Sequence, residues 1–127
     1  MPWTAEYSAR GADLRFFERS DGVEIYEANM EVYWHPYEDG FHYVIVDFSA
    51  VEYLDVSLAD LLRLADHDRQ YLLRNPSYLL VTIAPQGHVF GLARMFEHYM
   101  EGSTLRSTVV ASRAEALAWL DAELLVV

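Results

Sequence analysis

The chain has 127 residues, 53% of them hydrophobic and 14% aromatic, a composition that fits one folded domain and excludes a disordered chain. Its 20 acidic residues outnumber nine arginines, and the formal net charge of −11 argues against binding to nucleic acid or to an anionic membrane surface. Cysteine and lysine are absent, which excludes disulfides, thiolate nucleophiles, sulfur-ligated metals and lysine Schiff bases.

The N-terminal third of the sequence predicts a β-hairpin followed by a helix. Residues 3–8 and 13–19 alternate apolar and polar side chains around a turn at residues 9–12. Asp21 and Glu24 have the spacing of a capping box and predict the start of a helix. Pro36 predicts its end, because proline disfavours the helical conformation of the residue before it.

The rest of the sequence alternates apolar strands with amphipathic helices. Residues 43–48 and 78–84 are nearly continuous apolar runs, typical of strands covered on both faces, and residues 104–110 are a weaker third candidate. Apolar side chains recur with helical spacing in residues 58–72 and 89–100. Ser112 and Glu115 form a capping-box pattern before the last helix.

The resulting order of elements is ββαβαβαβα. Strand–helix–strand units need crossover connections, so we predict one α/β domain over residues 1–127, with a mixed five-stranded sheet and about four helices. These helices either cover both faces of the sheet or share one. In the second case the apolar side chains of the central strands lie open on the other face, and such a surface marks an interface. We therefore expect a homodimer.

Two features of the sequence bear on its location. Residues 1–6 have neither the charged region nor the apolar region of a signal peptide. No apolar run approaches the roughly eighteen residues of a membrane span. We therefore expect a cytoplasmic protein.

Residues 43–57, with the sequence YVIVDFSAVEYLDVS, combine an apolar strand with a short loop that ends D-x-S at a helix start. This pattern resembles the STAS domains of bacterial anti-anti-sigma factors, the SpoIIAA-like proteins. Residues 27–36 and 90–96 are similar to an uncharacterised bacterial branch of that group. The resemblance spans residues 15–120 and implies a STAS-like fold. It also implies a non-enzymatic module that binds a protein partner, as yet unidentified.

The resemblance further implies a role for the strand–helix junction. In the switch-type relatives, a kinase phosphorylates a serine there, and the unphosphorylated form binds the kinase. Ser57 stands at this phosphoacceptor position, and Asp55 also matches the pattern. The D-S-S-G of the family is D-V-S-L here, so this chain lacks the first serine and the glycine.

Ser57 and Asp55 also have purely structural interpretations. With Asp60 three residues later, Ser57 fits an N-cap whose hydroxyl accepts a hydrogen bond from the first helical turn. A phosphate on Ser57 is favoured by the positive end of the helix, although Asp47, Glu52, Asp55 and Asp60 repel it. Asp55 is predicted to orient the loop by accepting hydrogen bonds from backbone N–H groups.

Two other functions stay open at this point. Aromatic residues crowd the segment 26–43, and those that core packing does not use are available to line a pocket or a dimer interface. The alternative function is therefore a module that binds a small apolar or lipid-like ligand beneath its helices. The third is a hydrolase, with Ser57, a histidine and Asp55 or Asp47 as a triad, although the sequence has no GxSxG motif.

The remaining polar clusters predict no metal and no cofactor. His35, Glu38, Asp39 and His42 place two imidazoles and two carboxylates within eight positions, but their spacing matches no known metal motif. Residues 66–68 (D-H-D) and 97–101 lie in predicted helices, where we expect solvent-exposed charged faces.

Overall fold

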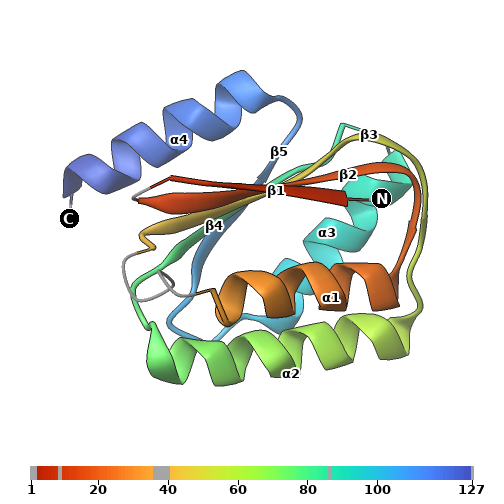
Figure 1. Ribbon diagram of the computed structural model, residues 1–127, viewed down its shortest axis with the longest axis horizontal. Helices are drawn as coiled ribbons and strands as arrows, with labels where there is room; N and C mark the ends of the chain where they lie inside the picture. Colours follow the sequence, from red (N-terminus) through yellow and green to blue (C-terminus); the bar gives the residue numbers. More distant parts are fainter. Residues whose placement is uncertain (1–2, 9, 36–40, 86, 127) are drawn as a thin grey trace.

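The computed structural model of the chain describes residues 3–8, 10–35, 41–85 and 87–126. A five-stranded sheet forms its middle layer, with helices on both faces (Figure 1). The predicted α/β class and the order ββαβαβαβα are confirmed. In chain order, the elements are β1 Trp3–Tyr7, β2 Gly11–Asp21, α1 Gly22–Tyr33, β3 Tyr43–Asp55, α2 Leu58–Arg74, β4 Leu79–Ile83, α3 Gly87–Tyr99, β5 Arg106–Val110 and α4 Arg113–Val126.

The strands lie side by side in chain order, β1-β2-β3-β4-β5, and only β1 runs antiparallel to its neighbour. The turn of the predicted hairpin closes with a hydrogen bond of 2.9 Å from the Ser8 N–H to the Gly11 carbonyl oxygen. Gly11 is required here, because a Cβ at this position would overlap the Tyr43 ring on β3. The antiparallel β1 beside the parallel strands β2 to β5 confirms the predicted mixed sheet.

Three helices pack on one face of the sheet and the fourth on the other (Figure 1). Because the strand order follows the chain order, crossovers of one hand place α1, α2 and α3 on the same face. Helix α4 follows the last strand of the sheet, so no crossover holds it to that face. It packs on β3, β4 and β5, and covers the apolar face whose exposure led us to expect a homodimer.

Strand β4 is buried on both faces, as its continuous apolar sequence predicts. Leu80 faces the larger core beneath α1, α2 and α3. The alternate side chains of β4 face the smaller core under α4, whose buried residues are Ile45, Leu79, Val81, Ile83, Ala116 and Leu120.

Strand β3 is longer than predicted. The sequence predicts a strand over residues 43–48 and then a loop, whereas β3 continues to Asp55. The reason is its neighbour β2, which pairs with β3 from Gly11 to Asp21 and shifts register twice along the way. At the second shift, Glu18 has a positive φ of 56°, as bulged strands allow. Only residues 56 and 57 separate β3 from α2.

Candidate functional site

The first turns of α1, α2 and α3 lie where the parallel strands β2, β3 and β4 end (Figure 1). Ligands of open α/β sheets bind outside this carboxyl edge. Gly22 at the start of α1 packs tightly against α2, since a Cβ on Gly22 would lie 2.6 Å from the Asp60 Cγ. The strand–helix junction that contains Ser57 therefore sits beside a second helix start.

Ser57 is the N-cap of α2, and its hydroxyl forms the predicted capping box. The hydroxyl accepts a hydrogen bond of 3.1 Å from the Asp60 N–H, and the Asp60 carboxylate accepts one of 3.0 Å from the Ser57 N–H. This second hydrogen bond is the main cause that lowers the pKa of Asp60, and an ion pair with Arg63 adds to it. The Ser57 side chain is exposed to solvent.

Among the described residues, no loop N–H group donates a hydrogen bond to Asp55, so its predicted role as an acceptor is not seen there. Its carboxylate forms an ion pair of 3.5 Å with Arg19, and both side chains are mostly exposed. The Arg19 guanidinium lies 4.7 Å from the centre of the Tyr53 ring. We call the exposed set formed by Arg19, Tyr53, Asp55, Ser57 and Leu58 the α2 N-terminal surface.

The described residues do not form a Ser-His-Asp triad around Ser57. His88 lies nearby along the same edge, but its Nε2 accepts a hydrogen bond of 3.2 Å from the Leu54 N–H. Its ring stacks on Tyr53, with 5.5 Å between the ring centres. Asp47 faces the opposite side of the sheet and binds Arg113. The groups that hydrolysis needs are therefore held apart among these residues.

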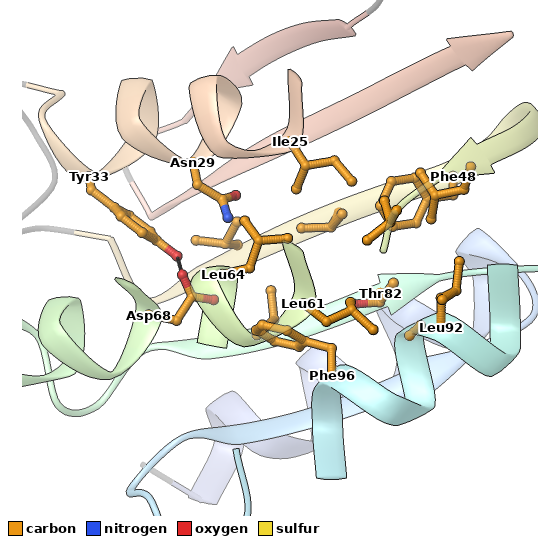
Figure 2. A pocket seen from close by; sticks show the side chains of 16 residues that line it. Ile25, Asn29, Tyr33, Phe48, Leu61, Leu64, Asp68, Thr82, Leu92 and Phe96 are labelled. Atoms are coloured by element: carbon orange, nitrogen blue, oxygen red, sulfur yellow. Dashed lines mark hydrogen bonds between the residues drawn. The ribbon is translucent and has the colours of Figure 1, made fainter. Parts of the chain in front are cut away.

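A cavity of about 70 Å³ lies between the sheet and helices α1, α2 and α3. We call it the interior cavity. Most of its wall is apolar, with Phe48 and Leu92 at one end, while Asn29, Tyr33 and Asp68 lie together at the other (Figure 2). Residues that flank the Ser57 junction, such as Val56, also line it.

The burial of Asp68 overturns the prediction that residues 66–68 form a solvent-exposed face. Asp66 is exposed as expected, but Asp68 is only 2% exposed and accepts a hydrogen bond from the Tyr33 hydroxyl (Figure 2). Burial raises the pKa of Asp68 from its usual value of 3.8 to about 7. Burial and the neighbouring Asp68 charge also raise the pKa of Tyr33 well above its ordinary value.

A signal for this burial is present in the sequence. The residues of α2 that face the core recur with helical spacing, and Asp68 occupies one of these positions; the set is Leu61, Leu64, Ala65, Asp68, Tyr71 and Leu72. The apolar side chains that recur with helical spacing in residues 58–72 also include Leu58 and Leu62, which are 54% and 50% exposed. The buried face of α2 is therefore rotated slightly from the apolar pattern of the sequence, and it includes the polar Asp68.

The predicted polar cluster around residue 40 lies partly outside the described residues, because Glu38 and Asp39 belong to the segment 36–40. The His35 ring stacks on Tyr7, with 3.9 Å between the ring centres. The described part of the chain contains no group of three or more side chains that could hold a metal ion. His98 on α3 and Glu101 in the turn after it are exposed as predicted and lie 3.4 Å apart, whereas Glu97 is partly buried.

Of the aromatic residues in segment 26–43, Tyr33 and Phe41 are buried in the larger core. Tyr26 and Trp34 are 42% and 66% exposed, and Tyr37 lies outside the described residues. Core packing therefore accounts for only part of this cluster.

Comparison with known proteins identifies the fold. The structure is similar to that of an uncharacterised protein of the DUF3478 family from Shewanella loihica PV-4, described as having a SpoIIAA-like fold. The TM-score is 0.52 at 13% sequence identity, and the match covers 93% of this chain and 91% of that chain. No family model and no curated protein matches the sequence. No helix among the described residues combines the length and hydropathy that a membrane crossing requires. The structural similarity shows that the chain has the SpoIIAA-like fold that its sequence predicts.

Proposed function

We propose that the chain is a non-enzymatic regulatory module that binds a protein partner through the α2 N-terminal surface. The observation that carries the proposal is the exposed Ser57 hydroxyl at a helix start, with Tyr53 and Leu58 exposed beside it at 47% and 54%. Tyrosine and arginine are enriched among the residues that contribute most to protein–protein binding. The α2 N-terminal surface contains one residue of each type, Tyr53 and Arg19, and Leu58 adds an exposed apolar side chain.

Phosphorylation of Ser57 is the regulation that we propose for this surface. A phosphate adds a charge of about −1.5 to −2 at the positive end of α2. It has to displace the Ser57–Asp60 capping interaction, and Arg19 and Arg63, which pair with Asp55 and Asp60, are cations available to receive it. Each already pairs with an aspartate, so the phosphate would redistribute these ion pairs. A partner that reads the charge of this surface would then bind the two forms differently.

The test compares proteins captured from the native cell by the wild type and by the variants Ser57→Ala, Ser57→Asp and Tyr53→Ala. We expect a protein that the wild type captures and that Ser57→Asp and Tyr53→Ala lose. Mass spectrometry of the purified chain would detect phosphate on Ser57.

Ser112 provides a matched control, because it forms the same capping box at the start of α4. Ser112→Ala and Ser112→Asp change helix capping equally but lie outside the α2 N-terminal surface, so they should keep the partner. Identical capture by all of these variants rejects the proposed surface.

The other predictions about partners stay proposals. We propose that the chain does not bind nucleic acid, because of its net charge of −11, and that it acts in the cytoplasm. A lipid-like ligand is not favoured, because a cavity of about 70 Å³ is far below the several hundred Å³ of ordinary ligand pockets. For a homodimer, the outer edge of β1 offers a second copy a strand to pair with. A monomeric mass in sedimentation at micromolar concentration rejects that dimer.

A further inference from the structure

The polar end of the interior cavity contains hydrogen-bonding groups that the chain itself leaves unused. Asn29 is 9% exposed and points from α1 toward α2 (Figure 2), yet its side chain hydrogen-bonds to no other residue that the structure describes. The Tyr33 hydroxyl uses its proton on Asp68. Buried polar groups without partners are unfavourable, so this end of the cavity is suited to an occupant.

The polar groups of the interior cavity that make no hydrogen bond to another described residue are mainly acceptors. Asp68 offers carboxylate oxygens and Asn29 an amide oxygen, and the donors are the Asn29 amide N–H groups and the Thr82 hydroxyl, which can also accept. An ammonium group has three donors and a positive charge, whereas a carboxylate would be repelled by Asp68. The aromatic rings of Phe48 and Phe96 line the cavity as well and favour a cation or an apolar chain beside them.

The size of the cavity limits the occupant. An engineered protein cavity of roughly 150 Å³ binds benzene, which has six heavy atoms. On that scale, about 70 Å³ accommodates ~3 heavy atoms. Water satisfies the polar end and can hydrogen-bond to the Thr82 hydroxyl near Leu92, but it gains no hydrogen bond from the side chains of Phe48 and Leu92 that line the same end.

We propose that the interior cavity binds the primary ammonium end of a short aliphatic amine. The ammonium group donates hydrogen bonds to Asp68 and to the Asn29 amide oxygen, and the carbon chain lies along the apolar wall. The net charge of −11 raises the local concentration of such cations around the chain. This site is separate from the α2 N-terminal surface and does not depend on the function proposed for it.

The test is a titration of the ¹⁵N-labelled full chain at pH 8 and constant ionic strength. Three two-carbon probes are added separately: ethylamine, which is protonated at this pH, ethanol and acetate. We expect ethylamine to cause saturable amide shifts at Asn29, Asp68 and Thr82, ethanol to bind about tenfold more weakly, and acetate to cause none. Equal responses to all three probes, or amine shifts confined to exposed acidic residues, overturn the proposal. A cavity that holds only water gives no saturable shift and also overturns it.

Two substitutions on α2 separate the site from general charge attraction. Asp68→Asn should weaken ethylamine binding about tenfold or more, because it removes the buried charge. Asp66→Asn removes the same charge from an exposed position of the same helix and should leave binding unchanged. An equal loss of affinity in both variants contradicts the site.

A third substitution covers the case in which Asp68→Asn does not fold. Ala93 lines the cavity from α3 and is only partly buried, so Ala93→Leu fills the cavity without altering Asp68. Binding of ethylamine should then be lost while the amide spectrum stays that of a folded chain. Unchanged affinity in Ala93→Leu overturns the proposal.

Discussion

Each face of the sheet buries an aspartate, but in opposite electrostatic surroundings. On the α4 face, Asp47 is 6% exposed, and although burial raises its pKa, hydrogen bonds from Ser49 and Arg113 bring the pKa below its usual value. On the face covered by three helices, burial raises the pKa of Asp68 to about 7, and only the Tyr33 hydroxyl opposes this. The comparison shows that the hydrogen bonds from Ser49 and the Arg113 cation offset the burial of Asp47, whereas the single hydrogen bond from Tyr33 does not offset the deeper burial of Asp68.

The largest expected effect comes from removing the ionisable group of Asp68. Its pKa is 3.8 when exposed and about 7 in the fold, so the folded chain holds an additional proton between these values. The stability that the neutral carboxyl contributes is complete below about pH 4 and is lost as the pH rises to about 7. Relative to Asp68→Asn, the free energy of unfolding of the wild type should fall by up to ~4 kcal/mol from pH 4 to pH 8, measured by urea unfolding.

The difference between these two proteins isolates Asp68 from its titratable neighbours. Tyr33 faces it from α1, Tyr78 approaches it from the start of β4, and His67 precedes it on α2. Burial lowers the pKa of His67, which gives a slope of the opposite sign that cancels in the difference. Parallel pH profiles for the wild type and Asp68→Asn would contradict the raised pKa.

The second effect tests the charge cluster of the α4 face. Arg113 donates two hydrogen bonds of 3.0 and 3.1 Å to Asp13 and one of 2.6 Å to Asp47. Arg113→Met leaves Asp47 buried without its cation, so we expect a loss of about 2–3 kcal/mol in urea unfolding. Arg106→Met breaks a more exposed pair with Glu123 and should lose less than about 1 kcal/mol. Equal losses would mean that burial does not strengthen the first cluster.

A smaller effect compares the helix starts on the two faces. Ser57 begins α2 and Ser112 begins α4, each within a capping box. Ser57→Ala and Ser112→Ala should each lose about 1 kcal/mol in urea unfolding, because either change removes one N-cap. Ser57→Asp should leave stability nearly unchanged, since aspartate also caps helices. A large loss in Ser57→Ala alone would indicate that Ser57 has a structural role beyond the cap.

The smallest effect is expected for the exposed ion pair at the carboxyl edge. The side chains of Arg19 and Asp55 are 70% and 60% exposed, in contrast to the buried Asp47. Asp55→Asn should change the urea-unfolding free energy by less than about 0.5 kcal/mol, and added salt should reduce even that difference. If Asp55→Asn lowers the free energy of unfolding as much as Arg113→Met, buried ion pairs do not stabilise this fold more than exposed ones.

The features that the sequence predicts correctly depend on residues close together in the chain. The capping boxes at Ser57 and Ser112 join residues three apart, and the apolar stripe of α3 from Val89 to Met100 is buried or partly buried as expected. Local hydrogen bonds and helical periodicity are encoded within a few residues, so no partner element is needed to recognise them.

The features that were missed depend on distant partners. Residues 49–55 do not have a continuous apolar run, and they form a strand because β2 pairs with them. Asp68 is buried because α1 places Tyr33 against it, 35 residues away in the chain. Whether a polar residue in an apolar stripe is buried can be decided only by knowing whether another element supplies a hydrogen-bond partner for it.

The sequence by itself determined the order of the elements, the starts of α2 and α4, and the position of Ser57 at a strand–helix junction, because these rest on local spacing. Only the tertiary structure decided that α4 packs on the second face of the sheet, that Arg113 hydrogen-bonds to Asp13, 100 residues away in the sequence, and that Asp68 lines a cavity. Charge and burial are properties of the assembled surroundings, so the pKa of Asp68 and that of Asp47 diverge although the residue is the same.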